Sequence, residues 1–279
     1  MKRFLYLWLF VTVMPALQSC TYVFFQPDKI DYSKYWSVNP DIKEIKVASF
    51  DGYEMTHWLI KAERSNPISF KGTVFFLHGN GQNYSAYVPL IHWMTRYGYN
   101  VFMFEYRGYS KNLAEISLKN TVTDVESALG YVLSKAEYGP VSLYGQSLGG
   151  SVAGFTAANF KNKASLCSVV LEAPFSSYRK IAREKLSTSW LTWLFQYPLS
   201  WLVNNDYSPI DSIHKIAPTP LLLIHSDEDR VVPSAHGKLL FDAAKQPKSY
   251  LSVKGLHIQA MKNPETQLSI MEFFKEQGC

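Results

Sequence analysis

Short apolar runs alternate along the chain with segments in which apolar residues recur at helical spacing. The apolar runs, bounded by turn-forming or polar residues, predict strands at residues 73–77, 101–105, 141–144, 168–171, 221–224 and 250–253. The segments between them predict helices at residues 88–97, 122–133 (after Thr121 as a cap), 147–160, 234–244 and 264–275. This alternation favours a mostly parallel central sheet with helices on both faces, and hence an α/β fold.

The start of the sheet has a different pattern. Two strand-like runs, residues 45–50 and 54–61, flank Asp51 and Gly52, a pair that is typical of a tight hairpin turn. We therefore expect an antiparallel N-terminal hairpin at the beginning of an α/β domain that spans residues 43–279.

Residues 176–217 interrupt the alternation between two strands. The segment is helical by pattern and apolar on one side, with three tryptophans in its middle, namely Trp190, Trp193 and Trp201. It predicts a small helical cap. The cap either only covers the core or also forms a lid that contacts acyl chains or lipid.

The first twenty residues have the layout of an exported protein. Lys2 and Arg3 precede an apolar stretch, residues 4–14, as in a secretory signal peptide. Residues 17–20, Leu-Gln-Ser-Cys, resemble a bacterial lipoprotein signal, which implies removal of residues 1–19 and lipid attachment at Cys20. An ordinary signal peptide or an uncleaved anchor with an incidental cysteine is the alternative.

The same resemblance implies a location. Thr21 stands where an aspartate would favour retention in the inner membrane, so we expect a lipid anchor in the bacterial cell envelope, at the outer membrane. Residues 20–42, aromatic and with two prolines, are then a tether between the anchor and the domain.

Composition excludes several classes of function. The net charge is +5 without a Lys/Arg block, so nucleic acid is not an expected partner. The three cysteines exclude a disulfide scaffold, and the chain has no CxxC pair that would indicate zinc. We expect Cys167 in the core and Cys279 exposed at the C-terminus, and the sequence alone does not favour a bridge between them.

The strongest chemical signal is Gly145-Gln146-Ser147-Leu148-Gly149, a G-x-S-x-G motif. An apolar strand ends just before it and a helix of small residues begins just after it, the context of a nucleophile elbow. Such a turn exposes the Ser147 hydroxyl above the sheet in a strained backbone conformation, and small residues are needed on either side of it.

A serine hydroxyl needs a general base, and the base needs an orienting acid. In this layout the chain order is serine, acid, histidine, which makes His257 the candidate base because it follows the predicted strand at residues 250–253. The acid follows the strand at residues 221–224, where Asp227, Glu228 and Asp229 are consecutive and position alone allows any of them.

From about residue 43 to the end, the chain resembles the α/β-hydrolase superfamily, and most of all its compact lipase-like, depalmitoylase-like and serine-aminopeptidase-like members. The segment from His225 to Pro233 matches the family's H-G-x-x-D-x-x-V-P pattern with Ser226 in place of glycine, which implies that Asp229 is the acid. His78-Gly79-Asn80-Gly81 matches its H-G-x-x loop, which implies an oxyanion hole formed by the backbone N–H groups of Asn80 and Leu148. Residues 105–109, Glu-Tyr-Arg-Gly-Tyr, resemble its D-Y-R-G-Y segment, and both His78 and Arg107 are expected to be structural.

These features predict a serine hydrolase that cleaves a carboxylic ester or thioester without a metal or organic cofactor. The apolar cap favours a lipid-like acyl substrate. A peptidase like the serine aminopeptidases is the alternative, and it would use acidic cap residues, Glu184, Asp206 or Asp211, to hold the amino terminus of its substrate. A catalytically silent binding lipoprotein is the second alternative.

Overall fold

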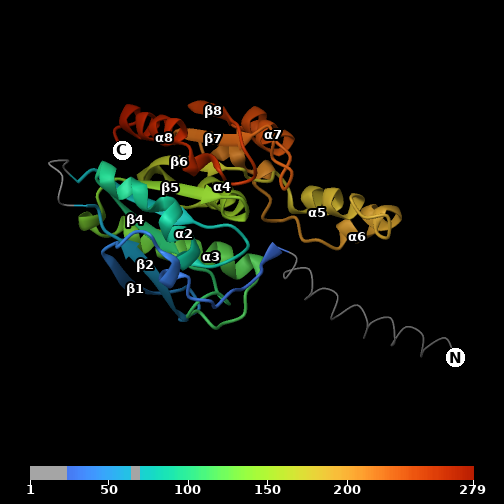
Figure 1. The fold of residues 1–279 in the computed structure, drawn as a ribbon. Helices are drawn as coiled ribbons and strands as arrows, with labels where there is room; N and C mark the ends of the chain where they lie inside the picture. Colours follow the sequence, from blue (N-terminus) through green and yellow to red (C-terminus); the bar gives the residue numbers. More distant parts are fainter. Residues whose placement is uncertain (1–23, 64–69) are drawn as a thin grey trace.

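The computed structural model describes residues 24–63 and 70–279, which form an α/β fold around one central sheet (Figure 1). The described strands are β1 (Ile42–Ala48), β2 (Glu54–Ile60), β3 (Gly72–Leu77), β4 (Tyr99–Phe104), β5 (Val141–Gln146), β6 (Leu166–Glu172), β7 (Leu221–Ser226) and β8 (Lys248–Val253). The predicted signal segment and Cys20 lie outside the described residues.

The sheet has the strand order β1-β2-β4-β3-β5-β6-β7-β8 among the described residues. The β1–β2 and β2–β4 pairs are antiparallel, and every pair from β4–β3 to β7–β8 is parallel. The predicted fold class, a mostly parallel sheet that begins with an antiparallel hairpin, is therefore confirmed.

Helices cover both faces of this sheet (Figure 1). The α-helices among the described residues are α2 (Tyr84–Ile91), α3 (Leu118–Leu133), α4 (Leu148–Asn159), α5 (Tyr178–Ser187), α6 (Gln196–Trp201), α7 (Ala235–Ala243) and α8 (Pro264–Glu276). Short 3₁₀ segments occupy Ser33–Tyr35, His92–Tyr97, Ala136–Tyr138, Lys163–Ser165, Trp193–Phe195, Pro209–Asp211, Ile213–Lys215 and Ala260–Lys262.

Two separate cores result from the alternation of side chains along each strand. In β4, Phe102 and Phe104 join the cluster that contains α3, α4 and α7, whereas Val101 and Met103 join the cluster under α2 and α8. Because both faces of the central strands are buried, these strands are continuously apolar rather than alternating.

Two helix starts differ from the sequence prediction. The helix expected after Thr121 begins at Leu118, because Ser117 caps it by accepting a hydrogen bond from the Asn120 amide. The helix expected at residues 88–97 begins at Tyr84 after the Asn83 cap and becomes a 3₁₀ segment from His92 onward. In both cases a polar cap extends the helix beyond its apolar stripe.

The expectation for Cys279 is wrong. Cys279 is buried, at 8% exposure, and its sulfur forms a disulfide bond with that of Cys167 on β6. The chain end is held here because α8 packs under the sheet and the Tyr99 hydroxyl donates a hydrogen bond to the Cys279 carbonyl at 2.7 Å. Sequence spacing alone does not show that the last residue returns to the sheet.

The segment before β1 lies along the loops at the carboxyl ends of the strands. Phe24 and Phe25 are buried, and the Gln26 amide donates hydrogen bonds to the Asn80 carbonyl at 3.1 Å and to the Tyr109 hydroxyl at 2.8 Å. Asn83 donates from its side chain to the carbonyls of Asp28 and Ile30. No helix within the described residues is long and apolar enough to span a bilayer.

The disulfide gives a first prediction. It joins residues 112 apart in sequence, and closing a loop of that length stabilises a fold by about 4–5 kcal/mol in the chain-entropy account. We therefore expect reduction with dithiothreitol to lower the free energy of unfolding, measured in urea, by a few kcal/mol. The Cys167→Ser/Cys279→Ser double variant is the control and should not respond to the reductant, whereas a wild type that is equally insensitive would contradict the bridge.

Candidate active site

Ser147 lies at the sharp turn between β5 and α4, above the carboxyl edge of the sheet. Its backbone has φ +57° and ψ −119°, a conformation that costs a non-glycine residue about 1–3 kcal/mol. The Ser147 N–H donates a 2.8 Å hydrogen bond to the Glu172 carbonyl on the neighbouring strand β6, which helps to hold the turn. The hydroxyl thereby projects from the turn into the space above the strands.

Two glycines make the turn sterically feasible. A Cβ on Gly145 would lie 2.3 Å from the carbonyl oxygen of Gly149, so these two positions do crowd each other across the turn. A Cβ on Gly149 would instead lie 2.3 Å from the carbonyl oxygen of Leu77 on β3. The elbow is therefore packed against the next strand as well as against itself, and neither position has room for a larger residue.

Ser147 and the two predicted partners meet in one hydrogen-bonded chain. The Ser147 hydroxyl lies 2.8 Å from Nε2 of His257, and Nδ1 of His257 lies 2.6 Å from Oδ2 of Asp229. His257 comes from the loop after β8, and Asp229 from the loop after β7. This series of hydrogen bonds links a hydroxyl, an imidazole and a carboxylate in the order that activation of the hydroxyl requires.

The structure separates the three consecutive acids. Asp227 is exposed and accepts hydrogen bonds from Lys238 and Ser252, and Glu228 accepts one from the Gly255 amide. Among these three carboxylates, only Asp229 contacts His257 within the described residues. The loop therefore directs one acid inward and leaves its two neighbours to hold the surrounding turns.

Asp229 is held as a carboxylate. Burial favours its neutral form, but the hydrogen bond and charge of His257 and the amides of Val232 and Val231 outweigh burial, so the pKa of Asp229 is lowered. Both amides donate to Oδ1, at 2.9 and 2.8 Å, which leaves Oδ2 to accept a hydrogen bond from Nδ1 of His257. The acid is thus fixed in orientation and in charge.

The two expected oxyanion donors are adjacent to Ser147. Leu148 is the first residue of α4, and its N–H is one that a helix leaves without an intrahelical acceptor. The Asn80 N–H donates no hydrogen bond to any described residue, and both residues line the same cavity as Ser147. Both N–H groups therefore belong to residues on the wall of the Ser147 cavity, where a backbone donor could meet a carbonyl oxygen of a bound substrate.

The Asn80 carbonyl is held by two hydrogen bonds. That oxygen accepts hydrogen bonds from the Tyr109 hydroxyl at 2.5 Å and from the Gln26 amide at 3.1 Å. His78 lies beneath, with Nε2 2.8 Å from Glu105 and Nδ1 2.8 Å from the Gly79 carbonyl. His78 makes no hydrogen bond to Ser147, which is consistent with a structural role for its ring.

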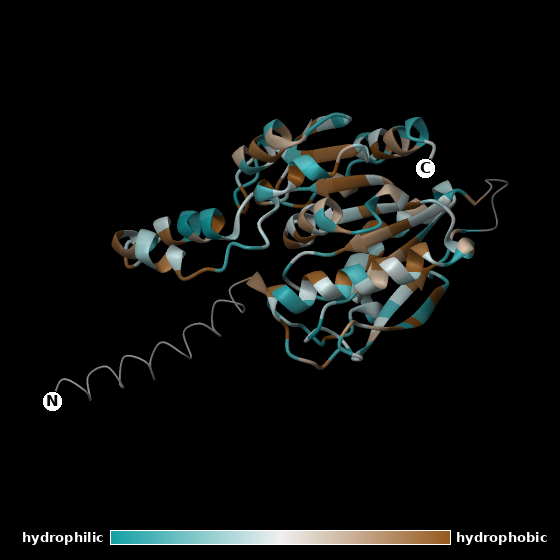
Figure 2. Ribbon diagram, turned by 180° about the vertical axis from the view of Figure 1, so that it is seen from behind, coloured by the Kyte–Doolittle hydropathy of each residue, from teal (hydrophilic) through white to brown (hydrophobic). Residues whose placement is uncertain are grey.

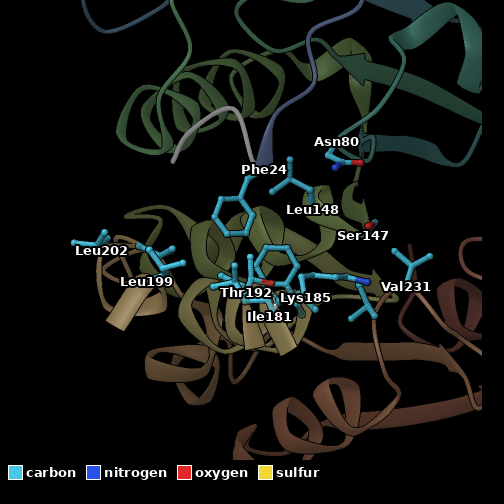
Figure 3. Close-up of a pocket in the computed structure, with 15 residues that line it drawn as sticks. Phe24, Asn80, Ser147, Leu148, Ile181, Lys185, Thr192, Leu199, Leu202 and Val231 are labelled. Atoms are coloured by element: carbon cyan, nitrogen blue, oxygen red, sulfur yellow. Dashed lines mark hydrogen bonds between the residues drawn. The ribbon is translucent and has the colours of Figure 1, made fainter. Parts of the chain in front are cut away.

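The Ser147 hydroxyl faces a cavity of about 460 Å³ between the body and the cap (Figure 3). Its walls are mostly apolar and include Phe24, Phe175, Ile181, Leu186, Leu199 and Val203. Among the described residues that line it, Lys185 alone is charged, and Figure 3 shows its side chain reaching toward the part of the cavity near Val231.

The acidic cap residues lie elsewhere. Glu184 is paired with Lys180 at 2.8 Å and with Nε2 of the buried His236 at 2.8 Å, which joins α5 to α7. Glu184, Asp206 and Asp211 are all absent from the described lining of the cavity. None of the three is therefore placed to hold the amino terminus of a peptide beside Ser147.

Two residues of the site were not predicted from the sequence. Glu172, at the end of β6, is buried and accepts hydrogen bonds from Tyr144 and Gln146, and burial raises its pKa. The sequence signal that could have identified Glu172 is a carboxylate directly after the apolar run at residues 168–171. Lys185 gave no signal, because its position depends on how α5 packs over the cavity.

Within residues 24–63 and 70–279, no group of three or more His, Cys, Asp or Glu side chains is arranged to hold a metal ion. The chemistry that this arrangement supports is activation of the Ser147 hydroxyl for attack on a carbonyl carbon.

Comparison with known proteins agrees with this fold. Residues 69–215 match the family described as serine aminopeptidase, S33. The chain is 30% identical over 249 residues to the uncharacterized protein YfhR of Salmonella typhi, an alignment that covers 85% of this chain and 80% of that one. It is 31% identical over 193 residues to the human alpha/beta hydrolase domain-containing protein 17B, covering 66% of this chain and 59% of that one.

A solved structure with a similar fold is the Pyrococcus furiosus esterase Pf2001. It superposes with a TM-score of 0.69 at 19% identity, covering 91% of this chain and 98% of that one. At this identity the likeness shows the shared α/β-hydrolase fold.

The geometry predicts how reactive Ser147 is. Asp229→Asn removes the charge that stabilises a protonated His257, so labelling of Ser147 by a fluorophosphonate probe should slow by about 10³-fold or more. Asp227→Asn is the matched control two residues away and should label within about threefold of wild type, because its carboxylate contacts only surface partners. If the two variants exchanged these rates, the assignment of the acid would be wrong.

Proposed function

Because the chain belongs to the serine aminopeptidase S33 family of α/β-hydrolases, whose fold hosts esterases and peptidases, we propose that it is a serine hydrolase that cleaves a carboxylic ester or thioester. The observation that carries the proposal is the chain of hydrogen bonds from Ser147 through His257 to Asp229, which opens on an apolar cavity.

In the proposed reaction, Ser147 Oγ attacks the carbonyl carbon while its proton passes to Nε2 of His257. The carbonyl oxygen becomes an oxyanion, which the amides of Asn80 and Leu148 stabilise. Collapse breaks the bond to the leaving alcohol or thiol, which takes the proton from His257 and leaves an acyl-serine. Water then attacks the acyl group by the same route, releases the carboxylic acid and restores the Ser147 hydroxyl.

The cavity favours an acyl substrate over a peptide with a free amino terminus. An ammonium group would have to enter an apolar space whose one described charge is the cation of Lys185, with no carboxylate on the described walls to pair with it. An acyl chain has no such cost, since it exchanges water for apolar side chains. A purely binding role is disfavoured by the complete nucleophile, base and acid within hydrogen-bond distance of one another.

We also propose that the protein is anchored in the bacterial cell envelope, at the outer membrane, through a lipid on Cys20. The lipoprotein-like segment at residues 17–20 and the following Thr21 support the anchor and its membrane. The Cys167–Cys279 bridge supports export, because disulfides persist mainly outside the reducing cytoplasm.

The proposed activity has a direct test. Ser147→Ala should lower hydrolysis of p-nitrophenyl esters by about 10⁴-fold or more while leaving the urea unfolding transition in place. A series of acyl lengths, with aminoacyl-anilides measured beside it, separates esterase from aminopeptidase activity. Preferential cleavage of the anilides, or full ester turnover by a folded Ser147→Ala variant, would overturn the proposal.

Lipid attachment is tested in cells. An alkyne analogue of palmitate should label the wild-type protein and not the Cys20→Ser variant, because the thioether bond forms on that sulfur. Cys279→Ser serves as the control and should label like wild type. Equal labelling of the Cys20→Ser variant would refute the anchor.

A further inference from the structure

One segment of the cap exposes an unusual amount of apolar surface. Trp190 is 83% exposed, Leu194 71% and Trp201 68%, and their neighbours Leu191, Trp193, Phe195 and Tyr197 are exposed as well. We call these seven residues the cap face. Exposed large apolar residues gathered over so short a stretch of chain indicate an interaction surface rather than scattered surface positions.

The cap face has the chemistry of a membrane interface. Residues 188–203 contain no charged side chain, and the cap face is rich in tryptophan and tyrosine, which favour the boundary between headgroups and acyl chains. Basic residues of α5 precede it in the chain, Arg179 among them, and the Arg183 guanidinium lies 5.3 Å from the centroid of the Tyr197 ring on the cap face. Glu184, the one acid of α5, is already paired with Lys180 and His236. An apolar surface edged by cations is complementary to a bilayer that contains anionic lipid.

The cap face continues into the cavity. Leu199 and Leu202 are exposed on the cap beside it and also line the cavity that Ser147 faces. Figure 3 shows these two leucines at the side of the cavity away from Ser147, and Figure 2 shows the hydrophobic outer end of the cap projecting from the body. An apolar path therefore joins the outer surface of the cap to the nucleophile.

Phe24, the first described residue, lies on the same side of the protein as the cap face. Phe24 lines the cavity and packs against Phe175 and Tyr178. Cys20 is four residues before it, and four residues reach at most about 14 Å. A lipid on Cys20 therefore holds the cavity within a short distance of the bilayer. Because so short a tether keeps the protein next to the bilayer, a membrane is favoured over a protein partner as the occupant of the cap face.

We propose that the cap face inserts into the interface of the bilayer to which Cys20 is anchored, and that the cavity receives its substrate from that bilayer. This inference rests on the proposed hydrolase function and narrows its substrate to a membrane-resident ester or thioester with a long acyl chain. The acyl chain enters past Leu199 and Leu202 and lies along the apolar wall, with its carbonyl at Ser147.

Insertion is measured by tryptophan fluorescence. The wild-type chain is reconstituted into vesicles of phosphatidylglycerol and phosphatidylcholine whose acyl chains are brominated, because bromine quenches only tryptophans that reach the lipid. We expect quenching in the wild type and its loss in the Trp190→Phe/Trp193→Phe/Trp201→Phe variant. The other described tryptophans, Trp36, Trp58 and Trp93, pack on the body.

The effect on catalysis is measured with two esters. Leu194→Asp places a carboxylate on the cap face outside the described cavity lining, so it should slow hydrolysis of vesicle-embedded p-nitrophenyl palmitate by about tenfold. Hydrolysis of water-soluble p-nitrophenyl acetate should stay within about twofold of wild type. Leu113→Asp is the matched control, since Leu113 is 70% exposed outside the cap, and it should leave both rates unchanged.

The outcomes are distinguishable. Absence of quenching in the wild type, or equal embedded-ester rates for Leu194→Asp and Leu113→Asp, would overturn membrane insertion. Absence of quenching together with a dimer by sedimentation would overturn it in favour of a second copy of the chain on the cap face. Quenching without hydrolysis of either ester would support insertion and overturn only the assigned hydrolase activity.

Discussion

The strained backbone of Ser147 is the constraint on which the site depends. A positive φ at a non-glycine residue persists only where its surroundings enforce it, and here they do so from three strands. The Glu172 carbonyl of β6 holds the Ser147 amide, the carbonyls at the end of β3 press against Gly149, and Gly145 of β5 leaves room for the turn. Parallel pairing of β3, β5 and β6 is therefore a condition for presenting the hydroxyl.

The partners of Ser147 reach it because parallel strands end at one edge of the sheet. Asp229 and His257 follow β7 and β8, and Asn80 follows β3, so residues far apart in sequence share one surface. Asp229 and Asn80 are then held by groups of their own loop or of a neighbouring segment, and His257 by its hydrogen bonds to Asp229 and Ser147. The Val231 and Val232 amides orient Asp229, and the Tyr109 hydroxyl and the Gln26 amide hold the Asn80 carbonyl. The strands place these groups, and the loop hydrogen bonds set their direction.

The fold was predictable from the sequence because its strands are short apolar runs between clear turn signals, and because the G-x-S-x-G turn has a strict local context. The choice of Asp229 over Asp227 was not predictable from position, since the loop geometry that turns one carboxylate inward involves amides that every residue has. The cap was visible as an apolar interruption, but the cavity beneath it and the place of Lys185 arise from tertiary packing. The burial of Cys279 likewise depends on the angle at which α8 returns to the sheet.

The contact between Gln26 and Asn80 has a practical consequence for work with a soluble form of the protein. Deleting the residues before β1 as a dispensable stalk would remove Phe24 from the cavity wall and would remove the hydrogen bond that the Gln26 amide donates to the Asn80 carbonyl. A chain shortened in this way would keep Ser147, His257 and Asp229, yet lose one of the two hydrogen bonds that hold the Asn80 carbonyl. Kinetic constants measured on the shortened chain would then not represent the intact site. Residues 24–26 are, in this chain, part of the surroundings of the candidate active site, and any expression boundary belongs upstream of Phe24.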